Sequence, residues 1–201
     1  MSTATEVSIC SNALLLLGAQ TIADFDEDSD RARLASNLYP SVRDGVLRMH
    51  PWNCCVRRVA LSPDVVGPAF DWDFQFTLPP DYIRTLSVGE YGAEDDFKIE
   101  GGKLLCNSDP CLLRYVARNE SPASWDDLLV RAVQLAMAAA MAYPITQSST
   151  LRDSMRQEFA QVLRMARSVD GLDETPEILG DSPLLQSRFG TSGDSRNIWR
   201  G

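Results

Sequence analysis

Residue types that could carry out catalysis are scarce in this sequence. Its single histidine, His50, directly precedes Pro51, so a Ser-His-Asp or Cys-His arrangement would have to use this one imidazole. The adjacent thiols Cys54 and Cys55 are the candidates for a thiol-dependent hydrolase. However, a proline disfavours the α conformation in the residue before it, which favours a structural role for His50. Neither glycine-rich phosphate-binding motif is present. We therefore expect no enzyme activity, no catalytic residue and no cofactor.

Five cysteines could bind a metal ion or form disulfides, but their spacing favours neither. Their number is odd and two are adjacent, which is awkward for a disulfide framework. A zinc site that uses Cys54, Cys55, Cys106 and Cys111 would need their loops to converge, and neither C-x-x-C spacing nor a second histidine supports it. We expect buried free thiols at all or most of the five positions: Cys10, Cys54, Cys55, Cys106 and Cys111.

A carboxylate cluster, residues 24–30, partly fits the calcium-binding loop of an EF-hand. The fit fails at the sixth loop position, where Ser29 replaces glycine, and at the twelfth, where Ala35 replaces the bidentate glutamate. We expect a solvated loop whose acids stabilise the N-terminus of the following helix, and no metal site.

Composition and charge argue against two other classes of protein: nucleic-acid-binding modules and proteins that span a membrane. The chain of 201 residues is 44% hydrophobic and has a net charge of −9, whereas a nucleic-acid-binding module concentrates Lys and Arg. No run of about 20 apolar residues, the length that spans a bilayer, is evident. We expect a protein made in a cytoplasm, with one domain or one domain that carries an inserted lobe.

Helical periodicity predicts two helices before residue 50. Thr3 and Glu6 form a capping-box pattern for the first, which Gly18 should end. The second begins near Asp30, and Pro40 should kink or split it. It must stop at the structural corner His50-Pro51-Trp52-Asn53, where the indole of Trp52 provides a bulky anchor against the core.

Between residues 56 and 118 the spacing of apolar residues changes from helical to alternating with polar residues. This alternation predicts four to five mostly antiparallel strands. Phe70, Trp72, Phe74 and Phe76 alternate with polar residues, and we interpret this aromatic stripe as core packing. Further strands are expected at residues 83–88, 97–100, 103–106 and 111–116, with a hairpin turn at residues 101–102.

A second helical pair follows. Ser124 should cap a helix that is apolar around most of its circumference and must therefore be surrounded on several sides. Pro144 should end or kink it, and Ser149 or Thr150 should cap a last helix that ends at Gly171. The predicted fold class is α+β: a four-helix bundle from residues 1–55 and 119–174, an inserted β-rich lobe at residues 56–118, and an extended C-terminal tail at residues 175–201.

The tail cannot form a core of its own. Its charges balance, and fully extended it would reach on the order of 90 Å. Two interpretations stay open: a disordered tail, or a segment that becomes ordered on a partner. Trp and Arg are typical interface anchors, so the candidate partner-interface residues are Leu184, Leu185, Arg188, Phe189, Arg196, Ile198, Trp199 and Arg200.

Taken in order, short motifs along the chain resemble the head-to-tail adaptor family of short-tailed bacteriophages, also called tail tubular protein A. Two positions depart from the family pattern: Pro40, where a polar helix former is more usual, and Cys54-Cys55, which replaces an ordinary apolar pair. The motifs that carry the resemblance are Ile9–Leu14 with Leu17-Gly18, Arg43-Asp44, Val46-Leu47, His50–Asn53, Leu78–Arg84 ("LPxDxxR"), Ile99–Gly101 with Leu104-Leu105, Leu113–Val116, Leu135–Ala140 and Ile145-Thr146.

The resemblance implies a structural virion protein of the phage neck and tail, assembled in the host cytoplasm. Such adaptors form a dodecameric ring beneath the portal, extend the DNA channel and provide the platform on which the tail tube or nozzle docks. The implied partners are the portal protein, the tail tube or nozzle protein and other copies of the chain. DNA would pass without sequence-specific binding, and no membrane is involved. The alternative is a small helical scaffolding or regulatory module that binds a partner protein through its C-terminal peptide.

Overall fold

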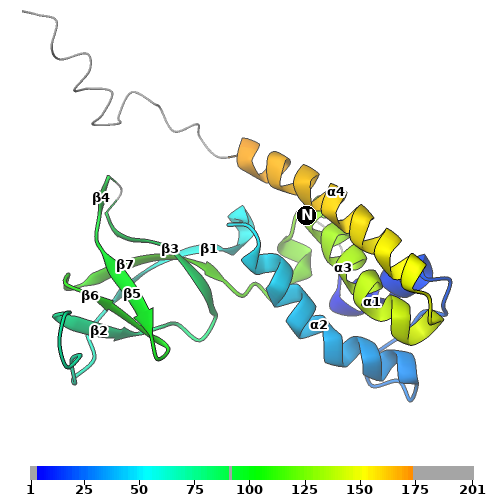
Figure 1. Ribbon diagram of the computed structural model, residues 1–201, viewed down its shortest axis with the longest axis horizontal. Coiled ribbons are helices and arrows are strands. Elements are labelled where there is room, and N and C mark those ends of the chain that lie inside the picture. Colours follow the sequence, from blue (N-terminus) through cyan, green and yellow to red (C-terminus); the bar gives the residue numbers. More distant parts are fainter. Residues whose placement is uncertain (1–3, 91, 174–201) are drawn as a thin grey trace, which may run out of the picture.

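A computed structural model describes residues 4–90 and 92–173 of the chain. Within these residues, four helices and seven strands form two lobes (Figure 1). The helices are α1 (Glu6–Leu16), α2 (Asp30–Arg48), α3 (Asp127–Thr146) and α4 (Ser149–Leu172), with short 3-10 turns η1 (Asn53–Cys55) and η2 (Pro122–Ser124). The strands are β1 (Val56–Leu61), β2 (Phe74–Thr77), β3 (Tyr82–Glu90), β4 (Ala93–Glu94), β5 (Phe97–Glu100), β6 (Lys103–Cys106) and β7 (Cys111–Ala117).

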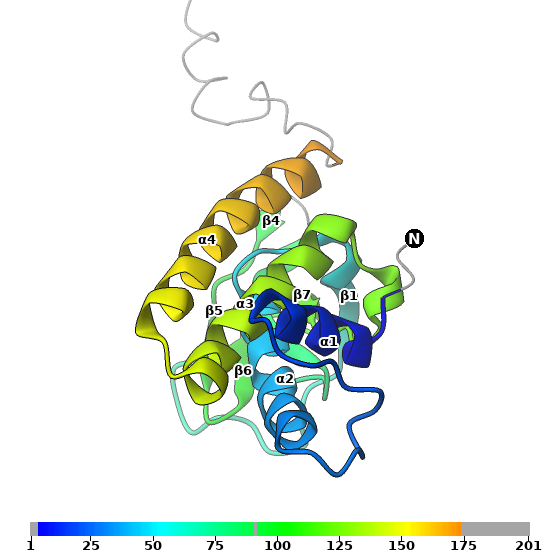
Figure 2. The same cartoon turned by 90° about the vertical axis from the view of Figure 1, so that its right-hand side faces the viewer.

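The helical lobe is built around α3, as the end-on view in Figure 2 shows. Residues on several sides of α3 are buried, among them Leu129, Val133, Met137 and Met141, because this helix is apolar around most of its circumference. Helices α1, α2 and α4 each pack on α3, and α4 has little contact with α1 or α2.

The predicted four-helix bundle is therefore wrong, although the α+β composition is as expected. The strands separate the first two helices from the last two along the chain. The physical reason for the error lies in α3, which supplies apolar surface in several directions and allows its neighbours to pack on it separately. In a bundle α4 would also pack against α1 or α2, which it scarcely does here.

By length and composition α3 could cross a membrane, which the sequence analysis did not anticipate; its most apolar window has a mean hydropathy of 1.6. A buried core helix of a globular protein meets the same criteria, and half of this window is buried inside the structure. The packing of the other three helices on α3 accounts for its apolar character.

Several predicted helix ends are displaced. Thr5, not Thr3, caps α1, and its side chain forms a reciprocal capping box with Ser8. Asp126 rather than Ser124 caps α3, and Ser148 caps α4. In each case the capping oxygen accepts a hydrogen bond from an otherwise unpaired backbone amide of the first turn.

The two helix-internal prolines do not have the predicted effect on helix length. Helix α2 is continuous from Asp30 to Arg48 across Pro40, and α3 runs past Pro144 to Thr146. The αL conformation of Gln147 ends α3. At Gly18 the backbone φ is +71°, in line with its predicted role at the end of α1.

The strands form two antiparallel sheets instead of one sheet of four to five strands. The first has the order β1-β7-β3-β4 and the second β2-β6-β5. Side chains from facing surfaces of the two sheets form a small core that includes Phe76, Val88, Leu104 and Leu113.

The predicted aromatic strand at residues 70–76 is shorter than expected. Asp71 has a φ of +69°, which interrupts an extended chain, and only residues 74–77 join the sheet. Phe76 is fully buried, as predicted for a packing residue, whereas Phe70 is 77% exposed. The interpretation of the whole stripe as core is therefore wrong at Phe70.

Candidate functional site

The predicted structural corner is present between α2 and β1. Trp52 is almost completely buried, and its indole Nε1 donates a hydrogen bond to the carbonyl oxygen of Val46, 3.2 Å away. The ring of His50 meets this indole edge to face, with centroids 4.8 Å apart. The buried indole both fills the core and satisfies a carbonyl in the last turn of α2.

This corner also holds the end of α4, 117 to 120 residues further along the chain. Nε2 of His50 lies 3.0 Å from Oδ2 of Asp170. The backbone amide of Asn53 donates to the same carboxylate, with the nearer oxygen at 3.2 Å, and Asn53 Nδ2 donates to the main-chain oxygen of Asp170 at 2.8 Å. We call His50, Asn53 and Asp170 the α4 clamp.

The α4 clamp fastens the C-terminal end of α4 to the corner. Helix α4 ends at Leu172, two residues after Asp170. A carboxylate near a helix C-terminus is unfavourable for the helix dipole, so external hydrogen bonds are needed to offset this placement. The sequence analysis missed Asp170. The signal that could have indicated it is an acidic residue at the C-terminal end of a predicted helix, where a carboxylate is unfavourable.

The thiols beside the corner form a pair with each other. Sγ of Cys54 and Sγ of Cys55 are 3.7 Å apart, and this contact lowers the pKa of Cys54 while it raises that of Cys55, which is also desolvated by burial. The ring of His50 is hydrogen-bonded to Asp170. Among the described contacts, His50 therefore interacts with the carboxylate of Asp170 and with no thiol.

All five cysteines are free thiols, and four of them are buried. Burial raises the pKa of Cys10 to about 12. Cys55 belongs to the helical core, whereas Cys106 and Cys111 belong to the core between the sheets. The four thiols of the alternative zinc site therefore do not converge. Within residues 4–90 and 92–173, no group of three or more His, Cys, Asp or Glu side chains is arranged to hold a metal ion.

The acidic loop before α2 is solvated, as predicted. The side chain of Ser29 caps α2, and the carboxylates of Asp28 and Asp30 are almost fully exposed. Both lie within ion-pair distance of Arg33. Surface pairs of this kind contribute little to stability.

Charged residues of α2 connect the two lobes. Arg43 is only 6% exposed and lies close to the carboxylates of Glu6, Asp44 and Glu120. Arg48 donates to the carbonyl oxygen of Ile83 in β3. Arg48 therefore links α2 to the β-rich lobe, whereas the contacts of Arg43 lie within the helical lobe.

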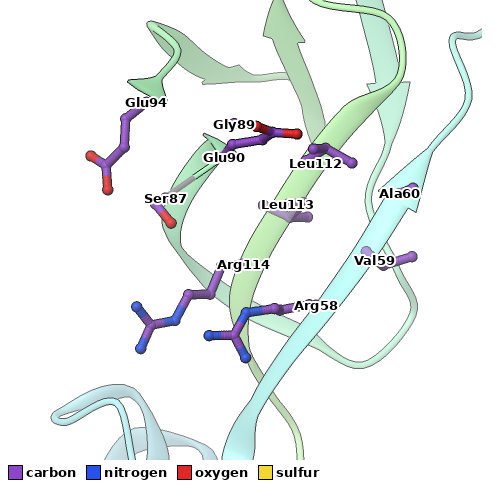
Figure 3. A pocket seen from close by; sticks show the side chains of 10 residues that line it. All are labelled: Arg58, Val59, Ala60, Ser87, Gly89, Glu90, Glu94, Leu112, Leu113 and Arg114. Atoms are coloured by element: carbon purple, nitrogen blue, oxygen red, sulfur yellow. The ribbon is translucent and has the colours of Figure 1, made fainter. Parts of the chain in front are cut away.

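One hollow of about 420 Å³ lies on the face of the first sheet (Figure 3). Arg58 of β1 and Arg114 of β7 project from one end of it, and Glu90 and Glu94 lie toward the other. Leu112 and Ala60 also line the hollow and give it apolar surface.

The predicted partner-interface residues all lie outside the described part of the chain. They are Leu184, Leu185, Arg188, Phe189, Arg196, Ile198, Trp199 and Arg200. The described structure brings together His50, Trp52 and Asn53 at the corner, and adds Asp170 to them. A comparison with protein-family models finds no match to this chain, and a comparison with curated proteins finds no significantly similar sequence.

Proposed function

We propose that this chain is a head-to-tail adaptor of a short-tailed bacteriophage, which forms a ring under the portal and provides the platform for the tail tube or nozzle. The order of the short motifs along the chain supports this proposal. In this role the protein acts through its shape and its contacts, without catalysis.

The α4 clamp is the structural observation that supports the proposal best. An adaptor has to present its connecting segment from a fixed position on a rigid body, because a displaced segment would miss the neighbouring ring. His50 and Asn53 hold Asp170 at the end of α4, the helix from which residues 174–201 continue. We propose that the interface residues of that segment, Leu184 to Arg200, contact the portal or an adjacent subunit.

The charge of the chain fits a channel through which DNA moves. A wall with a net negative charge repels the phosphate backbone and gives DNA no strong binding site, and the chain carries a net charge of −9. We expect acidic side chains to predominate on the channel surface of the ring. A ring structure in which mainly basic side chains face the channel would contradict this expectation.

We expect the free subunit to be a monomer. Its C-terminal segment would become ordered when it contacts the portal, and the ring would assemble there. In a ring, each subunit meets its neighbours through two different surfaces. Sedimentation velocity of the purified protein tests this order of events: we expect a monomer, and a stable ring in the absence of portal would contradict templated assembly.

The function itself is tested by binding to the cognate portal ring. We expect the full-length chain to co-sediment with portal rings, and Trp199→Ala to weaken this binding, because a buried Trp anchor typically accounts for about 2 kcal/mol or more of binding energy. Phe70→Ala is the matched control, since Phe70 is exposed on the β-rich lobe. Absence of co-sedimentation would contradict the adaptor proposal.

A further inference from the structure

Two adjacent thiols lie side by side in the turn that leads from the helical lobe into the first sheet. Cys54 and Cys55 belong to the 3-10 turn η1, which follows the corner and continues directly into β1 at Val56. Their Sγ atoms are 3.7 Å apart. We call Cys54 and Cys55 the vicinal thiols. The proposed adaptor role makes no use of them.

The vicinal thiols differ in exposure and in acidity. Cys54 is half-buried, whereas Cys55 is completely buried. The contact between the two sulfur atoms is the main cause that lowers the pKa of Cys54, and the same contact raises the pKa of Cys55. A thiolate, not a thiol, attacks a disulfide. Cys54 is therefore the attacking group, and Cys55 is the second thiol beside it.

The reaction that this arrangement favours is exchange with a small disulfide. The thiolate of Cys54 attacks one sulfur of the small disulfide, forms a mixed disulfide and releases one small thiolate. Cys54 then carries no negative charge, so the contact that mainly raises the pKa of Cys55 is weakened. The thiolate of Cys55 attacks Sγ of Cys54 and expels the second small thiolate. The two protein thiols are thereby oxidised, and the small disulfide is reduced to two thiols that take up the two protons.

A disulfide between adjacent residues would change the geometry of η1. The Cα atoms of neighbouring residues are about 3.8 Å apart, whereas those of bridged cysteines are usually about 4.4–6.8 Å apart, so the bond would strain the turn. Strained disulfides are reduced readily, as a reversible site requires. Asn53 begins the same turn, and its amide donates to the carboxylate of Asp170. The strain would therefore arise next to the contact that holds the end of α4.

We infer that Cys54 and Cys55 form a redox-sensitive site, which a small disulfide converts into a disulfide between the two residues, and that this oxidation loosens the α4 clamp. The inference goes beyond the proposed adaptor role and does not depend on it, because the site lies within a single subunit. Failure of the redox test would leave the portal-binding test unaffected.

Mass spectrometry of the full-length protein, incubated with oxidised glutathione, tests the reaction. We expect the wild-type chain to lose two hydrogen atoms, with the new bond in the peptide that contains both vicinal thiols. In Cys55→Ser the exchange cannot be completed, so glutathione should remain on Cys54. The wild-type chain should carry glutathione at least about tenfold less often, because an adjacent thiol acts at a high effective concentration.

Three controls accompany this experiment. Cys55→Ala should behave like Cys55→Ser, and it avoids a buried hydroxyl group, which is costly without a partner. Cys54→Ser should not react, because the remaining thiols are buried. Cys106 and Cys111, which are both completely buried, should stay reduced in every variant.

Three results would overturn the site: a wild-type chain that does not react, glutathione that persists on wild-type Cys54 as it does in Cys55→Ser, or disulfides between chains. Hydrogen exchange tests the link to α4. The last two turns of α4 should exchange about fivefold faster or more in the oxidised than in the reduced wild-type protein, and Cys54→Ser after the same treatment should show no change. Unchanged exchange in the oxidised protein would overturn the effect on the α4 clamp.

Discussion

The α4 clamp makes a quantitative prediction for Asp170→Ala. The carboxylate accepts hydrogen bonds from His50 Nε2 at 3.0 Å and from the amide of Asn53 at 3.2 Å. Hydrogen bonds to a charged group contribute about 1.5–3 kcal/mol each when buried. Solvent screening lowers this value here, since the side chains of Asp170 and His50 are 12% and 21% exposed. We expect a total loss of about 2 kcal/mol in the free energy of unfolding.

The matched control is Asp173→Ala, the same substitution three residues later, at the C-cap of α4. Both variants remove a carboxylate from the helix C-terminus, which by itself is favourable by about 0.3–1 kcal/mol. The difference between their stabilities therefore excludes this dipole effect, which the two variants share. For a chain of this size, about 2 kcal/mol corresponds to a decrease in Tm of about 4–8 °C.

Urea unfolding followed by circular dichroism measures the difference, and hydrogen exchange of the last two turns of α4 locates it. We expect Asp170→Ala to unfold at lower urea and to exchange faster at the end of α4. Combining His50→Ala with Asp170→Ala should give a loss smaller than the sum of the single losses, because the two residues share one interaction. Equal stability of Asp170→Ala and Asp173→Ala would refute the clamp.

Three further predictions concern the body of the protein. In Gly89→Ala the new Cβ would lie 2.7 Å from the carbonyl oxygen of Ala93 at a φ of +96°, so urea unfolding should show a loss of about 1–3 kcal/mol; the control Gly45→Ala, on an open helical position, should gain about 0.5–1 kcal/mol. Trp52→Ala should cost about 3–5 kcal/mol in the same assay, and a loss below about 1 kcal/mol would contradict its role as a core anchor. Iodoacetamide at mildly alkaline pH should modify Cys54 first, because its pKa is lowered while the other four thiols are buried; mass spectrometry that finds a buried thiol modified before Cys54 would contradict the packing of that core.

The sequence predicted the elements of this fold better than their arrangement. Helical periodicity located all four helices, and the apolar circumference of α3 correctly indicated that it would be surrounded. Periodicity does not specify which helices pack on one another, however, and α4 packs on α3 with little contact to α1 or α2. Likewise, the alternation of aromatic and polar residues at 70–76 is typical of a strand. It does not predict the positive φ of Asp71, which interrupts the extended backbone.

The candidate site was predicted in part. Pro51 and Trp52 indicated a corner because their effects are local: proline restricts its neighbour, and a large indole needs a buried site. The partner of this corner was missed because Asp170 lies 120 residues from His50, and one sequence gives no pairing signal over that distance. The hollow at Arg58 and Arg114 was missed for a similar reason, since their opposition depends on the register of β1 and β7.

The most direct test of the adaptor proposal is negative-stain electron microscopy of the purified protein mixed with its cognate portal rings. The account predicts an additional ring stacked coaxially on the portal, and no ring in the sample without portal. Portal rings that remain bare, or that carry single bound subunits without a closed ring, would contradict it.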